Sequence, residues 1–297
     1  MKTIPQFPEC REILLEDKPL FDSIFHSWQP EVSAYTFTNI FAWRKPYTAR
    51  LAMANDLLIV SHLVNGNLSL MEPMGNGDKV KAIHECLKAT KVKTTFFDGV
   101  SGALAKELES DDRLTVVYDR NNADYLYKSD DLINLAGRKF DGKRNFVSRF
   151  KQKYEYEYIE LSADNVEACH NFAEQWCDDK ACDASEGLSR ERCAVYEMLS
   201  HIGELGICGG AVRVDGRVVA FSLGEALNKD TIVIHVEKGD TSLDGVYQLI
   251  NNEFCTHEAQ DYKFVNREQD LGIPGLRKAK ESYQPVKLVD SFRVSLR

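Results

Sequence analysis

The chain has 297 residues, which is enough for one large domain or two of ordinary size. Hydrophobic residues make up 43% of it and charged residues 28%, and this balance excludes a disordered, collagen-like or low-complexity protein. Acidic residues outnumber basic ones by 46 to 37, so the net charge of −9 argues against a protein that coats nucleic acid.

The apolar runs are short. One of the longest, residues 57–60, is far below the roughly 20 residues needed to cross a bilayer. The N-terminal residues lack the apolar core of a secretory signal, so we expect a cytoplasmic protein with no transmembrane segment. The eight cysteines form no Cys-x-x-Cys pair, and we therefore expect reduced thiols and no metal site, although Cys177 and Cys182 follow His170 closely.

In the first part of the chain, the hydrophobic pattern predicts a strand, two helices, a three-stranded antiparallel meander, and then alternating helices and strands. Asn and Gly residues at 55 and at 65–67 favour tight turns within the meander. The predicted strands are 12–15, 47–54, 57–63, 68–72, 94–100 and 114–118, and the predicted helices are 18–27, 33–43, 79–89 and 101–109.

The second part repeats this order, with Ser162 and Ser189 predicted to cap its first two helices. The predicted strands are 154–161, 210–214, 217–227, 231–237, 263–266 and 286–296, and the predicted helices are 163–177, 189–202, 246–257 and 276–283. We therefore expect an α/β (α+β) protein with an N-terminal domain at 1–130, a basic connecting segment at 131–153 and a C-terminal domain at 154–297.

Two motifs stand out. Asp-Tyr-Leu-Tyr at 124–127 precedes Leu-Ile-Asn-Leu-Ala-Gly-Arg-Lys-Phe at 132–140 and Lys-Arg-Asn-Phe at 143–146. Asn-Arg-Glu-Gln-Asp-Leu-Gly-Ile-Pro-Gly-Leu-Arg at 266–277 precedes Lys-Glu-Ser-Tyr at 280–283. With these motifs, the chain resembles over essentially its whole length the bacterial family that shares the C-terminal domain of phosphatidylglycerol lysyltransferase.

The resemblance and the order of elements imply two tandem domains like the GCN5-related N-acetyltransferases (GNAT), each a mixed, mostly antiparallel sheet flanked by helices. They also imply direct transfer of an acyl or aminoacyl group to an amine or hydroxyl, from acyl-CoA or aminoacyl-tRNA as co-substrate and with no tightly bound cofactor. The alternative is a non-catalytic ligand-binding protein on a degenerate transferase scaffold, because a fold does not fix a function.

The loop after the third meander strand of the second half is the first candidate site. In GNAT enzymes this loop and the following helix offer backbone N–H groups to a phosphate. The alternative is an ordinary strand–helix loop, because Asp240 and Asp244 would repel phosphate. The candidate donor-binding residues are Lys238, Gly239, Thr241, Ser242 and Gly245.

The basic run at 138–153 is the second candidate, with seven basic residues against one acidic. Such a run could bind the backbone of a tRNA, with Lys143 and Arg144 as contacts. The alternative is the solvated face of an amphipathic helix, with the interleaved aromatic residues at 140, 146, 150 and 154 buried.

The polar segment after the strand at 263–266 is the third candidate, because ligands bind at the carboxyl ends of strands in α/β sheets. The family resemblance implies that Tyr283 protonates the leaving group, and the alternative is an aromatic that packs on the sheet. Glu237, or His235 on the same face of its strand, would accept the acceptor's proton, unless His235 is a core residue. The substrate-binding candidates here are Asn266, Arg267, Glu268, Asp270 and Arg277.

Overall fold

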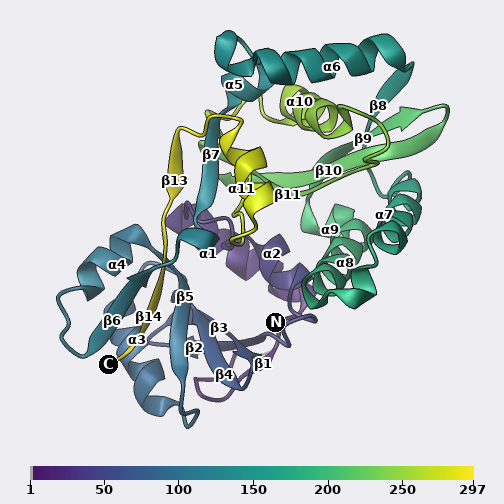
Figure 1. Cartoon of the computed structure of the whole chain (residues 1–297). Helices are drawn as coiled ribbons and strands as arrows, with labels where there is room; N and C mark the ends of the chain where they lie inside the picture. The colour runs from purple at the N-terminus through teal and green to yellow at the C-terminus, as the bar shows by residue number, and fades with distance from the viewer. Residues whose placement is uncertain (1–2) are drawn as a thin grey trace. The chain divides into compact units, whose positions relative to one another are not determined.

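The computed structural model describes residues 3–297, and the chain divides into two compact units. The first unit holds the described residues up to Asp124 together with Gln269–Ile273 and Leu288–Arg297, and the second holds Tyr125–Glu268 and Pro274–Lys287. Each sheet has seven strands, and helices flank both (Figure 1). The expected α/β architecture of two sheets with flanking helices is confirmed.

The first sheet contains the predicted meander, and β4 pairs in parallel with β5 at its end. Apolar side chains of the strands pack against α3 and α4 in one core that includes Ile59, Leu70, Ile83, Phe97 and Leu108. The sheet order is β1 (Arg11–Glu12), β2 (Arg50–Ala54), β3 (Leu57–Val64), β4 (Asn67–Met71), β5 (Thr95–Ser101), β14 (Ser291–Leu296) and β6 (Leu114–Tyr118). The helices of this part are α1 (Lys18–Trp28), α2 (Phe37–Ala42), α3 (Lys79–Ala89) and α4 (Gly102–Leu108), with 3-10 turns at Leu15–Asp17 and Arg120–Asn122.

The second sheet is built around the long strands β10 and β11. In Figure 1, α5, α6 and α10 lie above these strands and α7 and α8 lie below them. The sheet order is β13 (Lys287–Val289), β7 (Asp124–Lys128), β12 (Phe264–Asn266), β11 (Thr231–Gly239), β10 (Arg217–Asn228), β9 (Cys208–Val214) and β8 (Tyr156–Glu160). The helices are α5 (Ser129–Asn134), α6 (Asp141–Lys153), α7 (Glu167–Asp179), α8 (Glu186–Ser200), α9 (Ile202–Leu205), α10 (Val246–Glu258) and α11 (Pro274–Glu281), with 3-10 turns at Arg138–Phe140 and Cys182–Ala184.

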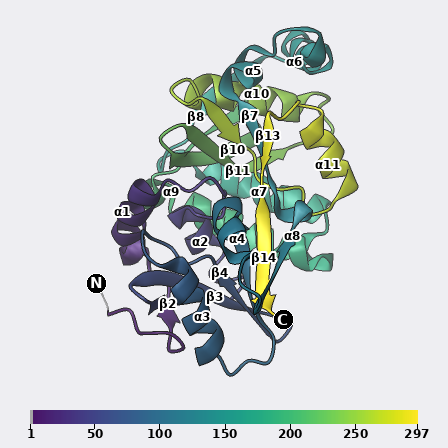
Figure 2. The ribbon, with the colours of Figure 1, turned by 90° about the vertical axis from the view of Figure 1, so that its left-hand side faces the viewer.

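The two sheets exchange strands, which the sequence analysis did not foresee. The segment predicted as one last strand of the second half is divided, and its later part, β14, pairs antiparallel with β5 and β6 in the first sheet. Conversely, β7 pairs with β12 in the second sheet. Figure 2 shows β14, in yellow, among the strands of the first sheet. The alternation of apolar residues predicts a strand but not the sheet that it joins, so the sequence could not reveal the exchange.

Two predicted helix starts are wrong. The helix predicted after Ser162 begins at Glu167, and the one predicted after Ser189 begins at Glu186. Ser185 caps the second of these helices, because its hydroxyl accepts a hydrogen bond from the Leu188 N–H at 3.4 Å. Ser185 and Ser189 are both favourable cap residues, so the residue type alone does not choose between them.

Strand β11 contains a β-bulge close to the candidate site. Leu223 of β10 pairs with Val236 and Gly224 pairs with Ile234, so His235 is an extra residue without a partner on β10. The neighbouring parallel strand β12 ends with Asn266 opposite Val233. A bulge bends its strand and redirects side chains, and this one lies just beyond the last pair of β11 with β12.

Candidate active site

Arg267 and Glu237 meet where β11 and β12 part. Arg267 follows β12 directly, and its Nη2 donates to Oε2 of Glu237 at 2.6 Å. Asn251 of α10 donates from Nδ2 to the other oxygen, Oε1, at 2.9 Å. The two ionic side chains are only 12% and 15% exposed, so the ion pair is largely removed from water.

Two cations lie over the ring of Tyr283. The Arg267 guanidinium is 4.6 Å from the ring centroid and Nζ of Lys143, on α6, is 4.0 Å from it. Tyr283 is buried and makes an edge contact with the ring of Tyr127. Burial raises the pKa of the Tyr283 hydroxyl well above its ordinary value, so this hydroxyl carries its proton at neutral pH. We call Lys143, Glu237, Arg267 and Tyr283 the Arg267 cluster.

The Arg267 cluster holds more positive than negative charge. Within residues 3–297, no carboxylate pairs with Lys143, and burial together with the nearby Arg267 lowers the pKa of Lys143 to about 8. Nε and Nη1 of Arg267 are buried, and neither has a hydrogen-bond partner within the same residues. Buried donors without acceptors are rare and costly, so these two nitrogens mark the cluster as a candidate site.

His235 holds the loop that carries Arg267. Its Nδ1 lies 2.9 Å from Oε1 of Glu268, and its Nε2 lies 2.9 Å from Oε1 of Glu225 on β10. Burial of the imidazole lowers its pKa, but the hydrogen bonds and charges of the two carboxylates outweigh burial and raise it to about 9. His235 is therefore an imidazolium in the core that anchors Glu268 beside Arg267.

Three N–H groups of the predicted donor loop already have acceptors. The N–H groups of Asp240, Ser242 and Leu243 donate to acceptors of the protein at 2.9, 2.9 and 3.1 Å. Lys238 pairs with Glu191 of α8 at 2.8 Å and lies over the Trp176 ring.

A Cβ at Gly245 would lie 2.8 Å from the carbonyl oxygen of Phe146 on α6, so the approach of α6 explains this glycine. Thr241 and Ser242 are exposed and Gly239 is buried. Phosphate binding by this loop stays a prediction.

The basic run forms a short 3-10 turn and the helix α6, and most of its charges are paired. Arg144 donates to Leu135 O, Gly137 O and Asp141, and it thereby ties α5 to α6. Phe140 and Phe150 are buried, and they pack within the protein. The remaining ion pairs are Lys139–Asp131, Arg149–Asp244 and Lys151–Glu253. These carboxylates weaken the positive field that a tRNA backbone would meet, and tRNA binding here stays a prediction.

The residues of the polar segment after β12 lie in different surroundings. Oδ1 of Asn266 accepts from the Glu268 N–H at 2.8 Å, which shapes the turn around Arg267. Asp270 belongs to the first unit, where it pairs with Arg120 at 3.1 Å and is fully buried. Arg277 lies half-buried on α11. Of the predicted residues, the structure thus brings Lys143, Glu237, Arg267 and Tyr283 together, with Glu268 beside them, whereas Arg144, Lys238 and Asp270 are engaged elsewhere.

Sequence reasoning missed three residues that support the cluster from outside. Asn251 fixes Glu237, and Tyr127 packs against Tyr283 while its hydroxyl donates to Lys280 O at 2.8 Å. Nζ of Lys280 donates to the carbonyl oxygen of Arg267. Tyr127 and Lys280 lie within the two sequence motifs, so the motifs could have indicated both residues. Asn251 lies in the middle of a helix and carries no such signal.

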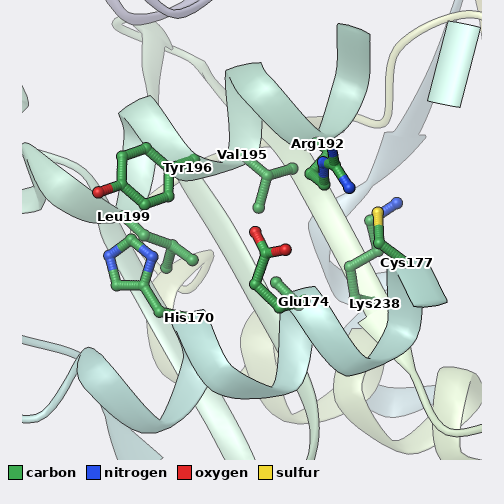
Figure 3. Close-up of a pocket in the computed structure, with 9 residues that line it drawn as sticks. His170, Glu174, Cys177, Arg192, Val195, Tyr196, Leu199 and Lys238 are labelled. Atoms are coloured by element: carbon green, nitrogen blue, oxygen red, sulfur yellow. The ribbon is translucent and has the colours of Figure 1, made fainter. Parts of the chain in front are cut away.

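A separate pocket lies between α7 and α8. Figure 3 shows His170 and Tyr196 at one end, Glu174 in the middle, and Arg192 with Lys238 at the other end. Both cations are already paired, Lys238 with Glu191 and Arg192 with Asp183 at 2.9 Å. Its Cys177 forms a disulfide with Cys182, so the expectation of reduced thiols is wrong for these two residues, which the chain brings together across one turn.

Comparisons with known proteins identify the family of the chain. The family described as "Phosphatidylglycerol lysyltransferase, C-terminal" matches residues 25–294. The chain belongs to this family. This is a family of proteins that transfer acyl or aminoacyl groups. No helix in the described part of the chain is long and apolar enough to span a bilayer.

Solved structures show the same fold. A conserved protein of unknown function from Bacteroides thetaiotaomicron is 36% identical, with a TM-score of 0.91 and coverage of 99% of this chain and 100% of that one. L-PGS from Bacillus licheniformis is 15% identical, with a TM-score of 0.67 and coverage of 99% and 94%. A tandem GNAT protein from the clavulanic acid biosynthesis pathway is 8% identical, with a TM-score of 0.51 and coverage of 96% and 97%. The expected tandem GNAT-like fold is thereby confirmed.

A curated relative, an uncharacterized protein from Mycoplasmoides gallisepticum, is 20% identical over 208 residues. The match spans 69% of this chain and 66% of that relative.

Proposed function

We propose that this protein transfers an acyl or aminoacyl group directly from a donor to an amine or hydroxyl, and that the Arg267 cluster is the reaction centre. The observation that carries this proposal is Arg267 itself, a buried guanidinium at the end of β12 with two nitrogens that lack acceptors. A carbonyl that becomes an oxyanion needs such donors in a site with little water. The family name, which refers to lysyl transfer, supports the same reaction class.

Each member of the cluster fits a step of acyl transfer. The acceptor N–H or O–H attacks the donor carbonyl, a new C–N or C–O bond forms, and the bond to the leaving group breaks. Nε–H or Nη1–H of Arg267 stabilises the oxyanion, and the protonated Tyr283 hydroxyl gives its proton to the leaving group. Glu237 keeps lone pairs beyond those used by Arg267 and Asn251, so it takes the acceptor's proton directly or through water.

The donor that we favour is an aminoacyl-tRNA. In the loop that binds the pyrophosphate of CoA in GNAT enzymes, three N–H groups already donate to acceptors of this protein, and α6 touches Gly245 at the start of α10. An acyl-CoA donor would have to displace these contacts. The family name supports an aminoacyl group but does not identify it.

Binding of the two donor classes tests this choice. Fluorescence anisotropy compares a minihelix that carries an aminoacyl group through a stable 3′-amide with the same minihelix lacking the aminoacyl group and with acetyl-CoA. We expect the amide-linked minihelix to bind more tightly than the bare one. Binding of acetyl-CoA alone would reassign the donor, and binding of neither, with no transfer, would support the non-catalytic alternative.

A further inference from the structure

The Arg267 cluster has one positive charge more than its own carboxylate neutralises. Lys143 and Arg267 converge on the same tyrosine ring, with the charged groups 4.0 and 4.6 Å from its centroid. Glu237 is the carboxylate that pairs with Arg267, and within residues 3–297 none pairs with Lys143. The charge of Arg267 helps to lower the pKa of Lys143, so the two cations repel each other and an additional anion would stabilise the arrangement.

Two hydrogen-bond donors of Arg267 also lack acceptors. Nε and Nη1 of Arg267 are buried without acceptors in the described part of the chain. Lys143 adds an ammonium whose contact in the structure is the face of the Tyr283 ring. Hydrogen bonds to oxyanions are stronger than those to neutral oxygens, so these donors favour a charged ligand.

We propose that Lys143 and Arg267 form a binding site for one monoanionic group of the substrate, a carboxylate or a phosphodiester. A single negative charge balances the cluster, whereas a dianion would be repelled by Glu237, 2.6 Å from Arg267. The inference rests on the proposed function for its biological role, because it names a substrate class for the same site. Binding of the anion itself needs no turnover.

The reactivity of Lys143 reports on this site, because only the neutral amine reacts with an acylating reagent. The pKa of Lys143 is about 8, so a substantial fraction is neutral at pH 7.5. A bound anion stabilises the ammonium and raises this pKa, and a rise of one unit lowers the labelling rate about tenfold. Lys153, exposed near the end of the same helix, is the matched control.

The experiment measures labelling of both lysines by N-succinimidyl propionate with peptide mass spectrometry. The probes are acetate and dimethyl phosphate, compared at constant ionic strength with their neutral counterparts acetamide and trimethyl phosphate. We expect an anion to slow labelling of Lys143 about tenfold at saturation and to leave Lys153 unchanged. The stronger of the two anions identifies the substrate group. Equal effects of the neutral counterparts, equal effects on Lys153, or no effect on Lys143 would each overturn the proposal.

Two variants sharpen the test. Glu237→Gln removes the competing carboxylate, so we expect half-saturation at an anion concentration about tenfold lower. The double variant Glu237→Gln/Arg267→Met removes both partners of the buried ion pair, and we expect its Lys143 to lose most of the response. An unchanged response in both variants would contradict the site. A protein that binds these anions but transfers nothing overturns the proposed function alone, and a protein that transfers but ignores both anions overturns this inference alone.

Discussion

Nη2 of Arg267 lies 2.6 Å from Oε2 of Glu237, and this ion pair joins the end of β12 to β11 just beyond the bulge at His235. The pair is largely buried, and Asn251 fixes the second carboxylate oxygen. Removing one partner of such a pair leaves an uncompensated charge, whereas removing both does not. Substitution of one partner alone therefore destabilises the fold, and the pair fixes the direction of the guanidinium.

This asymmetry gives a stability prediction. Glu237→Gln should lower the free energy of unfolding by about 2–4 kcal/mol, because Arg267 loses its counter-charge. The double variant Glu237→Gln/Arg267→Met should lose clearly less than the two single variants added together. Urea denaturation of the four proteins measures the coupling, and strictly additive effects would show that the two side chains do not form the pair described here.

A second prediction concerns the two tyrosines. Tyr283→Phe keeps the ring under Lys143 and Arg267 but removes the proposed acid, so turnover should fall about 100-fold or more while donor affinity changes little. Tyr127→Phe removes a hydroxyl of the same aromatic pair, the one that donates to Lys280 O. This control should cost about 1 kcal/mol of stability and leave turnover near wild type. If both variants lose turnover equally, Tyr283 has a structural role only.

The third prediction is a loss of stability at alkaline pH through His235. Its folded pKa of about 9 lies above the ordinary value of 6.5, so its contribution is fully present below pH 6.5 and is lost as the pH rises toward 9. The groups that face it are the carboxylates of Glu225 and Glu268. The free energy of unfolding should fall between pH 6.5 and 9 in the wild type and fall less in His235→Gln. Parallel pH profiles of the two proteins would contradict the buried imidazolium.

A fourth prediction concerns the cysteines. The eight residues should give six free thiols when the protein is denatured without reductant, because Cys177 and Cys182 are joined. Alkylation followed by peptide mass spectrometry counts them, and reduction should release the remaining two. A protein purified without reductant that shows eight alkylated cysteines has no such disulfide.

Many elements of this structure can be predicted from local sequence patterns. The meander of β2, β3 and β4 follows from alternating apolar runs separated by Asn and Gly turns, and the motifs pointed to Lys143, Arg267 and Tyr283 one at a time. The sequence did not reveal that Arg267 pairs with Glu237. These residues are 30 positions apart, and their meeting depends on the register of β11 with β12 and on the extra residue at His235. Register and bulges arise from tertiary packing, which local patterns do not encode.

The basic run shows the same limit. Its composition indicated a polyanion site, but the carboxylates that pair with Arg149 and Lys151 come from other segments of the chain. Lys143 differs because it faces a tyrosine ring and another cation. Composition cannot distinguish a paired cation from an unpaired one, and the structure does so directly.

The most direct test of the account is a single-turnover assay with labelled aminoacyl-tRNAs and acyl-CoAs, in the presence of a panel of amine and hydroxyl acceptors. It compares the wild type with Arg267→Lys, which keeps the charge beside Glu237 but loses Nε–H and Nη1–H. We predict transfer from one donor class by the wild type, and a rate at least about 100-fold lower in Arg267→Lys. Transfer at the wild-type rate by Arg267→Lys, or no transfer from either donor class by the wild type, would contradict a reaction centre at Arg267.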